Sequence, residues 1–197
     1  MYDTAGMKPR RLRQELRAAA FVSFLLLSAS AGCGGAGPYG HATHYAPLSD
    51  EESAAKGARD YDPVMYARVP EEWKKHRTSL FGVVASRSPG PGGAAYLTVT
   101  VRRLEPRNLC DSWRSEDTCR VTVSDRDFGM VHALARLKPE DDVGEISLGP
   151  GSLVRVIGTF GQDVDPGDGG PILRADYYRH WPRGYFVTGA AANEMRQ

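Results

Sequence analysis

The amino-acid sequence predicts a mainly β protein: a five-stranded Greek-key barrel with one helix between its third and fourth strands, preceded by a signal peptide and a flexible tether. Three observations predict this fold class. Segments of alternating apolar and polar residues recur between residues 79 and 182, glycine and proline clusters separate them, and one segment among them has helical spacing. The 197 residues are 41% hydrophobic and 25% charged, which is typical of a globular domain.

Three strands are expected in the first half of the barrel. Residues 79–87 are rich in β-forming residues, and the turn cluster SPGPGG follows them. Residues 95–104 alternate, with one face carrying Leu97, Val99 and Val101 and the other carrying Tyr96, Thr98, Thr100 and Arg102. Residues 119–125 alternate again, with Cys119, Val121 and Val123 opposite Arg120, Thr122 and Ser124.

A helix and two more strands are expected in the second half. Within residues 128–137, Met130, Val131, Leu134 and Leu137 have helical spacing, and Pro139 is expected to end the helix. His132 lies within this pattern and is expected on the helix surface or half-buried, with a catalytic role as the alternative. Residues 151–160 form the clearest strand. Residues 171–182 form the last one, with Leu173, Ala175, Tyr177 and Trp181 on one side, and a short extended piece covers 184–188. Three strands, a helix and two strands are the order of an OB-fold, a five-stranded Greek-key barrel.

The N-terminus has the three parts of a secretory signal peptide, which we assign to residues 1–32. A basic stretch at 7–17 precedes apolar and small residues at 18–32, and a helix of that length spans only about 22 Å, less than a bilayer core of about 30 Å. Two cleavage sites compete. Ala29-Ser30-Ala31 fits ordinary secretion. The residues from Ser30 to Cys33 resemble the lipobox of bacterial lipoproteins, and this resemblance implies a lipid on Cys33.

The three cysteines favour lipidation, because an odd thiol is unusual in an oxidising compartment. A lipid on Cys33 leaves Cys110 and Cys119 as a pair, and we expect a structural disulfide between them. Eight residues lie between these two cysteines, and antiparallel strands that close on such a loop can bring their Cα atoms within reach of a disulfide. A zinc knuckle or a catalytic dithiol is the alternative, but neither has this spacing.

The domain boundaries follow from composition. Residues 33–48 are rich in Gly, Ala and Pro and are expected to be a flexible tether, with His41 and His44 in solvent rather than on a metal. Residues 49–78 form a short helical lead-in. A capping box from Ser49 to Glu52 starts one helix, and Pro70 starts another that packs Trp73 against the barrel. The barrel covers 79–188, and 189–197 is a flexible tail.

These features together resemble small OB-fold lipoproteins of bacterial envelopes, in particular the starvation-inducible outer-membrane lipoprotein (Slp) family. The lipobox, FGVV in the first strand, GSLVRVIG and YYRHWP carry the resemblance over roughly residues 79–182. In the sorting rule that this resemblance implies, Gly34 after the cysteine directs the protein to the outer membrane. The rule does not decide between the periplasmic side and the cell surface.

The candidate binding face comes from the OB-fold, in which strands two and three and the adjoining loops contact ligands. It comprises Tyr96, Arg102, Arg120, Tyr178, Arg179 and His180. Asp163, Asp165 and Asp168, in the loop between the last two strands, are a weak candidate for calcium, and an acidic turn is the alternative. No cofactor and no resident metal are expected.

The function expected is that of a lipid-anchored cell-envelope protein acting as a non-catalytic binding or structural module. The alternatives are a module that binds polysaccharide or peptidoglycan, and a metal-assisted hydrolase using Asp125 and Asp127 near Arg126. The expected partners are the membrane, through the lipid, and envelope proteins. Nucleic acid is not expected, because the first 33 residues carry +3 and the rest carries −2.

Overall fold

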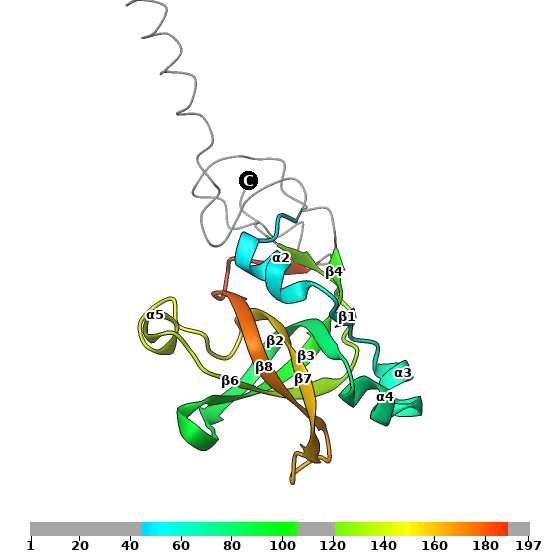
Figure 1. The fold of residues 1–197 in the computed structure, drawn as a ribbon. Coiled ribbons are helices and arrows are strands. Elements are labelled where there is room, and N and C mark those ends of the chain that lie inside the picture. The colour runs from blue at the N-terminus through cyan, green and yellow to red at the C-terminus, as the bar shows by residue number, and fades with distance from the viewer. Residues whose placement is uncertain (1–44, 106–120, 189–197) are drawn as a thin grey trace, which may run out of the picture. The chain divides into compact units, whose positions relative to one another are not determined.

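The computed structural model describes residues 45–105 and 121–188, which belong to one compact unit, Pro38–Gln197. Five of its strands close into a barrel (Figure 1): β2 (Arg77–Pro89), β3 (Ala95–Arg102), β6 (Met130–Ala135), β7 (Leu153–Val164) and β8 (Pro171–Trp181). They pair in the order β2-β3-β6-β8-β7, and β7 pairs with β2 to close the ring. The expected OB-fold-like barrel is confirmed.

Four of the five pairings in the barrel are antiparallel, and β6 pairs with β8 in parallel. Parallel neighbours need a crossover connection. Here the crossover runs through the short helix α5 (Pro139–Asp142) and strand β7, which lies on the far side of β8. This crossover gives the Greek-key topology and places a helix between the third and fourth strands of the barrel.

The helix expected at 128–137 was wrong, because most of this segment is strand β6. Val131, Ala133 and Ala135 have no exposed surface, and Val131 pairs with Val99 of β3. The segment fits both periods: its leucines fall at helical spacing, while its alanines complete a period of two. Pro139 begins the helix α5 instead of ending one, which is the position where a proline without an N–H is tolerated best.

The third expected strand, residues 119–125, does not belong to the barrel. In its described part, residues 121–125, only β5 (Thr122–Val123) is a strand, and it lies in a small sheet with β4 (Leu104–Glu105) and β9 (Val187–Thr188). Val121 and Val123 are buried as their alternation suggested, but they pack with Phe81, Leu153 and Trp181 in a cluster separate from the main core. The segment expected to be a helix is a barrel strand, and the segment expected to be the third barrel strand is not. The two errors offset each other, so the expected number of five barrel strands is correct.

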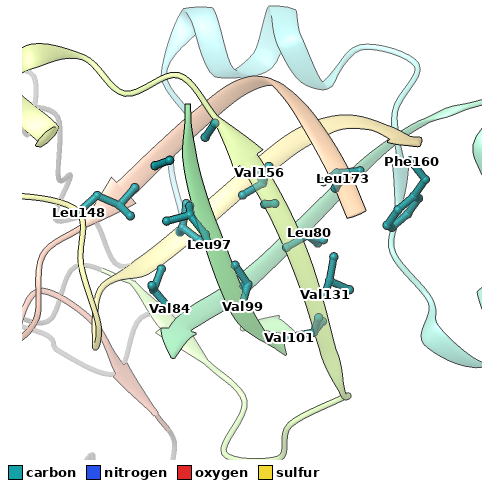
Figure 2. Packing of buried hydrophobic residues seen from close by; sticks show 14 of the residues in the cluster. Leu80, Val84, Leu97, Val99, Val101, Val131, Leu148, Val156, Phe160 and Leu173 are labelled. Carbon is teal, nitrogen blue, oxygen red and sulfur yellow. The ribbon is translucent and has the colours of Figure 1, made fainter. Parts of the chain in front are cut away.

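The main core fills the barrel with aliphatic side chains from every strand. Leu97, Val99 and Val101 of β3 are buried as expected. Figure 2 shows how side chains from neighbouring strands meet in the interior, together with Leu148 from the connection between α5 and β7. The strand residues labelled there are Leu80, Val84, Leu97, Val99, Val101, Val131, Val156, Phe160 and Leu173.

A register shift in β8 changes which residues face the core. Ile157 pairs with Tyr177 and Gly158 with Ala175, so Asp176 is an extra residue. Such a bulge reverses the alternation after it. Leu173 and Ala175 pack against the main core as expected, but the expected Tyr177 and Trp181 do not. Tyr178 replaces Tyr177 on that side, and Trp181 packs in the second cluster.

The lead-in consists of three short helices and a short strand: α2 (Ser49–Ala55), β1 (Arg59–Asp60), α3 (Pro63–Arg68) and α4 (Pro70–Lys74). Helix α4 begins at Pro70 and buries Trp73, as expected. The N-cap of α2 is Leu48, one residue earlier than expected, and only half of the expected capping box forms. The Glu51 carboxylate accepts from the backbone N–H of Leu48 at 3.0 Å, but leucine has no side-chain acceptor for the reciprocal bond. A turn of 3-10 helix, η2 (Pro91–Gly93), joins β2 to β3.

Among the described residues, no helix has the length and apolar character needed to cross a membrane.

Candidate functional site

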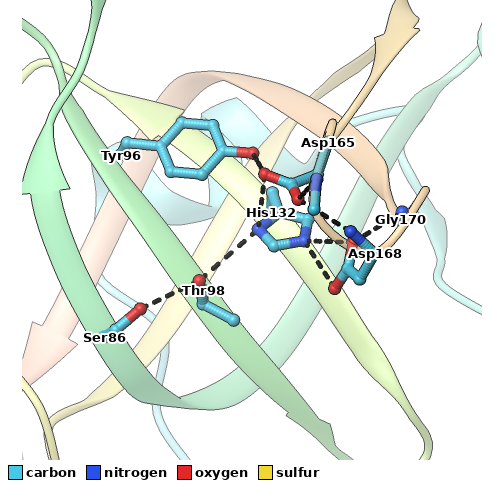
Figure 3. A network of polar contacts seen from close by, with 8 residues as sticks. Ser86, Tyr96, Thr98, His132, Asp165, Asp168 and Gly170 are labelled. Carbon is cyan, nitrogen blue, oxygen red and sulfur yellow. Dashed lines mark hydrogen bonds and ion pairs between the residues drawn. The ribbon is translucent and has the colours of Figure 1, made fainter.

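The loop between β7 and β8 folds over the outer face of β3 and β6 (Figure 3). Because Val131 and Ala133 point into the core, His132 between them points outward. The strand register places it opposite Thr98, and the loop covers it so well that only 5% of its side chain is exposed. This face and this loop form the region through which OB-folds generally bind.

Both nitrogens of the His132 ring have polar neighbours. Nε2 lies 3.0 Å from each carboxylate oxygen of Asp168. Nδ1 lies 3.4 Å from Oγ1 of Thr98 and 3.9 Å from Oδ2 of Asp165. The Tyr96 ring stacks on the imidazole with centroids 5.4 Å apart and an interplanar angle of 20°. The imidazole is therefore fixed in orientation between two carboxylates.

Asp165 is fixed just as firmly. The Tyr96 hydroxyl donates to its Oδ2 at 2.5 Å, and the backbone N–H groups of Gly167 and Asp168 donate to its Oδ1 at 2.8 and 3.1 Å. The hydrogen bond from Tyr96, followed by the one from Gly167, lowers the pKa of Asp165. Burial and the neighbouring Asp165 raise the pKa of Tyr96. Both shifts favour a protonated phenol on Tyr96 beside an ionised carboxylate on Asp165.

The sequence DPGDGG explains how the loop reaches His132. The backbone of Gly169 has a φ of 72°, a conformation that side chains with a Cβ rarely adopt. A Cβ on Gly170 would lie 2.9 Å from Oδ1 of Asp168 and 3.1 Å from Nε2 of His132. Glycine at position 170 therefore allows the backbone to approach the imidazole closely.

The metal candidates from the sequence are only partly brought together. Asp165 and Asp168 lie side by side, but Asp163 forms an exposed ion pair with Arg174 at 3.1 Å. His132 takes its place: one ligand atom each from His132, Asp165 and Asp168 lies within 4.8 Å of the others. We call these three residues the His132 cluster. Sequence reasoning missed His132 because it placed this residue on a helix, although the alternation of Val131, Ala133 and Ala135 would have aligned it with Tyr96.

A groove of about 590 Å³ lies beside this face, between the β2–β3 turn and β8. Its charged lining consists of Arg136, Lys138, Arg174 and Asp176, with Tyr177 and Tyr178 alongside. We call it the basic groove. Asp176 is paired with Arg77 at 3.2 Å, whereas the exposed side chains of Arg136 and Lys138 have no acidic partner among the described residues. The groove therefore offers positive charge to a ligand.

The remaining binding-face candidates do not form one surface. Tyr178 and His180 both contact Asp141 beside α5: the hydroxyl donates at 2.6 Å, and the imidazole Nδ1 lies 3.3 Å from the carboxylate. Arg102 donates to the backbone carbonyls of Ser124 and Asp125. These contacts hold the segments between the strands against the barrel, so Tyr178, His180 and Arg102 have a structural role.

Arg179 belongs to a buried ion cluster that joins α2 to the barrel. Glu51 of α2 has no exposed surface; Arg155 of β7 donates to its Oε1 and Arg179 of β8 to its Oε2, each at 2.7 Å. The Tyr45 hydroxyl also donates to Oε1, and the Leu48 N–H completes the shell. Burial by itself raises the pKa of Glu51, but the hydrogen bonds from Tyr45, Arg155 and Arg179 outweigh it and leave the pKa lowered. We call this the Glu51 cluster.

Several predictions concern residues that the structure does not describe. The lipidation site Cys33, the pair Cys110 and Cys119, and the binding-face candidate Arg120 lie outside the described residues, as do the signal peptide and most of the tether. Asp125 and Asp127, suggested for a hydrolase, are exposed in the connection between β5 and β6.

No protein-family model and no curated protein matches this sequence. Among solved structures, the chain is similar to the protein priB from Ralstonia solanacearum, with 12% identity over 53% of this chain and 96% of that one, at a TM-score of 0.28. It is also similar to a deletion mutant of the single-stranded DNA binding protein from Thermus aquaticus, with 19% identity and a TM-score of 0.28. That match covers 53% of this chain and about half of the other, 49%.

The expectation that nucleic acid is not a partner is contradicted, since the second of these neighbours is by its title a single-stranded DNA binding protein. The expectation rested on the net charge of −2 that residues 34–197 carry, which does not exclude a local basic patch. The exposed side chains of Arg136 and Lys138 form such a patch in the basic groove. The exclusion is withdrawn.

Proposed function

We propose that this chain is a lipid-anchored protein of the bacterial cell envelope, at the outer membrane, and that its barrel is a non-catalytic module that binds an acidic polymer of the envelope. The anchor is proposed at Cys33, from the resemblance of Ser30–Cys33 to a lipobox and the signal-like residues before it. The same proposal includes that the chain is related to the Slp family.

The observation that carries this proposal is the Glu51 cluster. It ties the segment that follows the tether to strands β7 and β8 through a fully buried carboxylate. Twelve residues lead from Cys33 to Tyr45, and even when fully extended they reach only about 43 Å. A lipid on Cys33 would therefore keep the barrel close to the membrane, because the chain is fastened to the barrel where the tether ends.

The basic groove favours an acidic polymer as the ligand. Arg136 and Lys138, which have no acidic partner among the described residues, supply positive charge to this groove, although residues 34–197 carry −2 overall. Arg174 also lines the groove, but it is paired with Asp163. Local positive charge attracts a polyanion even on a mildly acidic protein. An envelope polysaccharide that carries carboxylates or phosphates has this charge and is present where the proposed anchor holds the barrel.

The anchor is tested by labelling cells with a palmitate analogue. The expected result is a labelled, membrane-bound chain that loses the label in Cys33→Ala and keeps it in the control Cys110→Ala. If label persists after Cys33→Ala, or if the mature chain is found in solution with a free thiol at Cys33, the anchor proposal fails.

The ligand is tested by titrating the protein with an acidic polysaccharide and with a neutral one. Arg136→Glu combined with Lys138→Glu should weaken binding to the acidic polymer at least tenfold, whereas Arg68→Glu, an exposed cation on α3, should not. The affinity should fall as salt is added, since exposed charges are screened. A single-stranded oligonucleotide provides a third arm. Tighter binding to it at the same salt, lost in the same double variant, would make nucleic acid the ligand, and no binding in any arm would remove the role of the groove.

A further inference from the structure

We propose that the His132 cluster is a zinc site, with Nε2 of His132 and one carboxylate oxygen each from Asp165 and Asp168 as its protein ligands. This inference does not rest on the anchor or on the basic groove. It starts from a buried imidazole held between two carboxylates on the outer face of β3 and β6 (Figure 3).

The distances require little movement to close around a metal. Tetrahedral zinc with bonds of about 2.0–2.2 Å places its ligand atoms about 3.4 Å apart. Nε2 already lies 3.0 Å from both oxygens of Asp168, and one potential ligand atom from each of the three residues lies within 4.8 Å of the other two. The side chain of Asp168 is 38% exposed, so a metal can enter from the solvent side and keep a water as its fourth ligand.

The ligands also have the outer partners that metal sites need. Nδ1 of His132 lies 3.4 Å from Thr98 Oγ1, to which Ser86 donates at 3.0 Å, so the ring nitrogen opposite the metal faces a hydroxyl acceptor. The Tyr96 hydroxyl holds Asp165 at 2.5 Å, and the Gly170 N–H holds Asp168 at 2.7 Å. Such second-shell bonds fix the imidazole tautomer and aim the carboxylates.

The charge of the cluster calls for a cation. Asp165 and Asp168 are two acidic groups close together, and within the part of the chain that the structure describes no lysine or arginine pairs with either of them. A divalent ion bound to all three groups would cancel this charge in a partly buried place, where repulsion between carboxylates is weakly screened.

The donor set selects zinc over calcium. The calcium hypothesis required oxygen ligands from three aspartates, but the structure removes Asp163 and supplies an imidazole nitrogen. Calcium and magnesium prefer oxygen ligands, whereas zinc takes imidazole together with carboxylates and tolerates three protein ligands with one open position. The open position leaves room for water or for a group from a ligand on the same face.

The test is isothermal titration of the whole chain, purified in detergent, with ZnCl2 and separately with CaCl2. We expect one zinc site that is lost in Asp168→Asn and kept in the matched control Asp163→Asn, with no comparable calcium binding. Tyr96→Phe removes only an outer partner and should weaken zinc about tenfold. Co²⁺ in place of zinc should give the visible absorption of a site with few ligands, and Asp168→Asn should abolish it.

The variants also separate this site from other side chains of the chain that could bind zinc, which include its three cysteines and the histidines at 41, 44, 76 and 180. Since Asp168 is partly exposed, Asp168→Asn should fold, which circular dichroism checks. Zinc binding that is unchanged in Asp168→Asn would assign the metal to those other residues and overturn the proposal. The absence of zinc binding in the unmodified chain would also overturn it.

Discussion

Replacing Glu51 by glutamine should destabilise the protein more than almost any other change to one polar group. The substitution keeps the shape of the side chain but removes the negative charge with which Arg155 and Arg179 both form ion pairs. The side chains of these arginines are 12% and 5% exposed, so water cannot replace the lost partner. Breaking a buried ion pair on one side costs about 3–5 kcal/mol.

The assay is urea unfolding followed by tryptophan fluorescence, which reports on this region because the Arg179 guanidinium lies 4.5 Å from the centroid of the Trp181 ring. We expect a lower midpoint with an unchanged slope, and a melting temperature lower by roughly 10–20 °C. The matched control is Glu52→Gln, an exposed neighbour on the same helix, which should change the free energy of unfolding by less than about 0.5 kcal/mol. Equal stability of Glu51→Gln and the unmodified protein would refute the reasoning.

The same pair of proteins tests the pH dependence. The pKa of Glu51 is lowered from its ordinary value of 4.5 in the folded state, so the folded state favours the carboxylate. Its contribution is complete above the unfolded pKa and is lost as the pH falls through the folded pKa. The stability difference between the unmodified protein and Glu51→Gln should therefore be constant near neutral pH and shrink below about pH 4. A difference that grows on acidification would contradict this sign.

Three further predictions concern other parts of the chain. Gly158→Ala should destabilise the barrel by about 1–3 kcal/mol in the same urea assay, because its Cβ would lie 2.0 Å from the carbonyl oxygen of Arg174; an unchanged midpoint would show that β8 can move away. Burial, followed by the charge of the neighbouring Tyr66, raises the pKa of Tyr61 to about 12, so the free energy of unfolding should fall as the pH rises above the ordinary value of 10.0. Spectroscopic titration that finds every tyrosine ionising near 10.0 would contradict this. Non-reducing mass analysis should find Cys110 and Cys119 joined, and two free thiols would disprove the disulfide.

Runs of β-forming residues between turn clusters were enough to predict most of the barrel. The strands at 79–87, 95–104 and 151–160 correspond to β2, β3 and β7. Only β3 buries strictly every second residue, whereas β2 and β7 bury several consecutive residues. Residues 128–137 were predicted wrongly because their apolar residues, alanines included, fit both the helical period and the strand period. Only the pairing with β3 decides between the two. The bulge at Asp176 depends on how β7 pairs with β8, and the sequence of β8 alone does not predict it.

The sites were harder to predict because their residues are distant in sequence. Asp165 and Asp168 were recognised as possible ligands from their spacing within one loop, but their third partner His132 comes from a strand that was expected to be helical. Glu51 could not be singled out from the acidic residues around it. Only the tertiary fold, which brings Arg155 and Arg179 to α2, makes it a buried charge.

The position of β8 between β6 and β7 means that the ring cannot be completed until the end of the chain is present. A chain cut before Pro171 would leave one edge of β6 and one edge of β7 without hydrogen-bond partners, and such edges recruit strands from other molecules. During synthesis, the amino end emerges long before the last strand. Over that interval the unfinished chain is open to aggregation and depends on chaperones, whatever the stability of the finished fold.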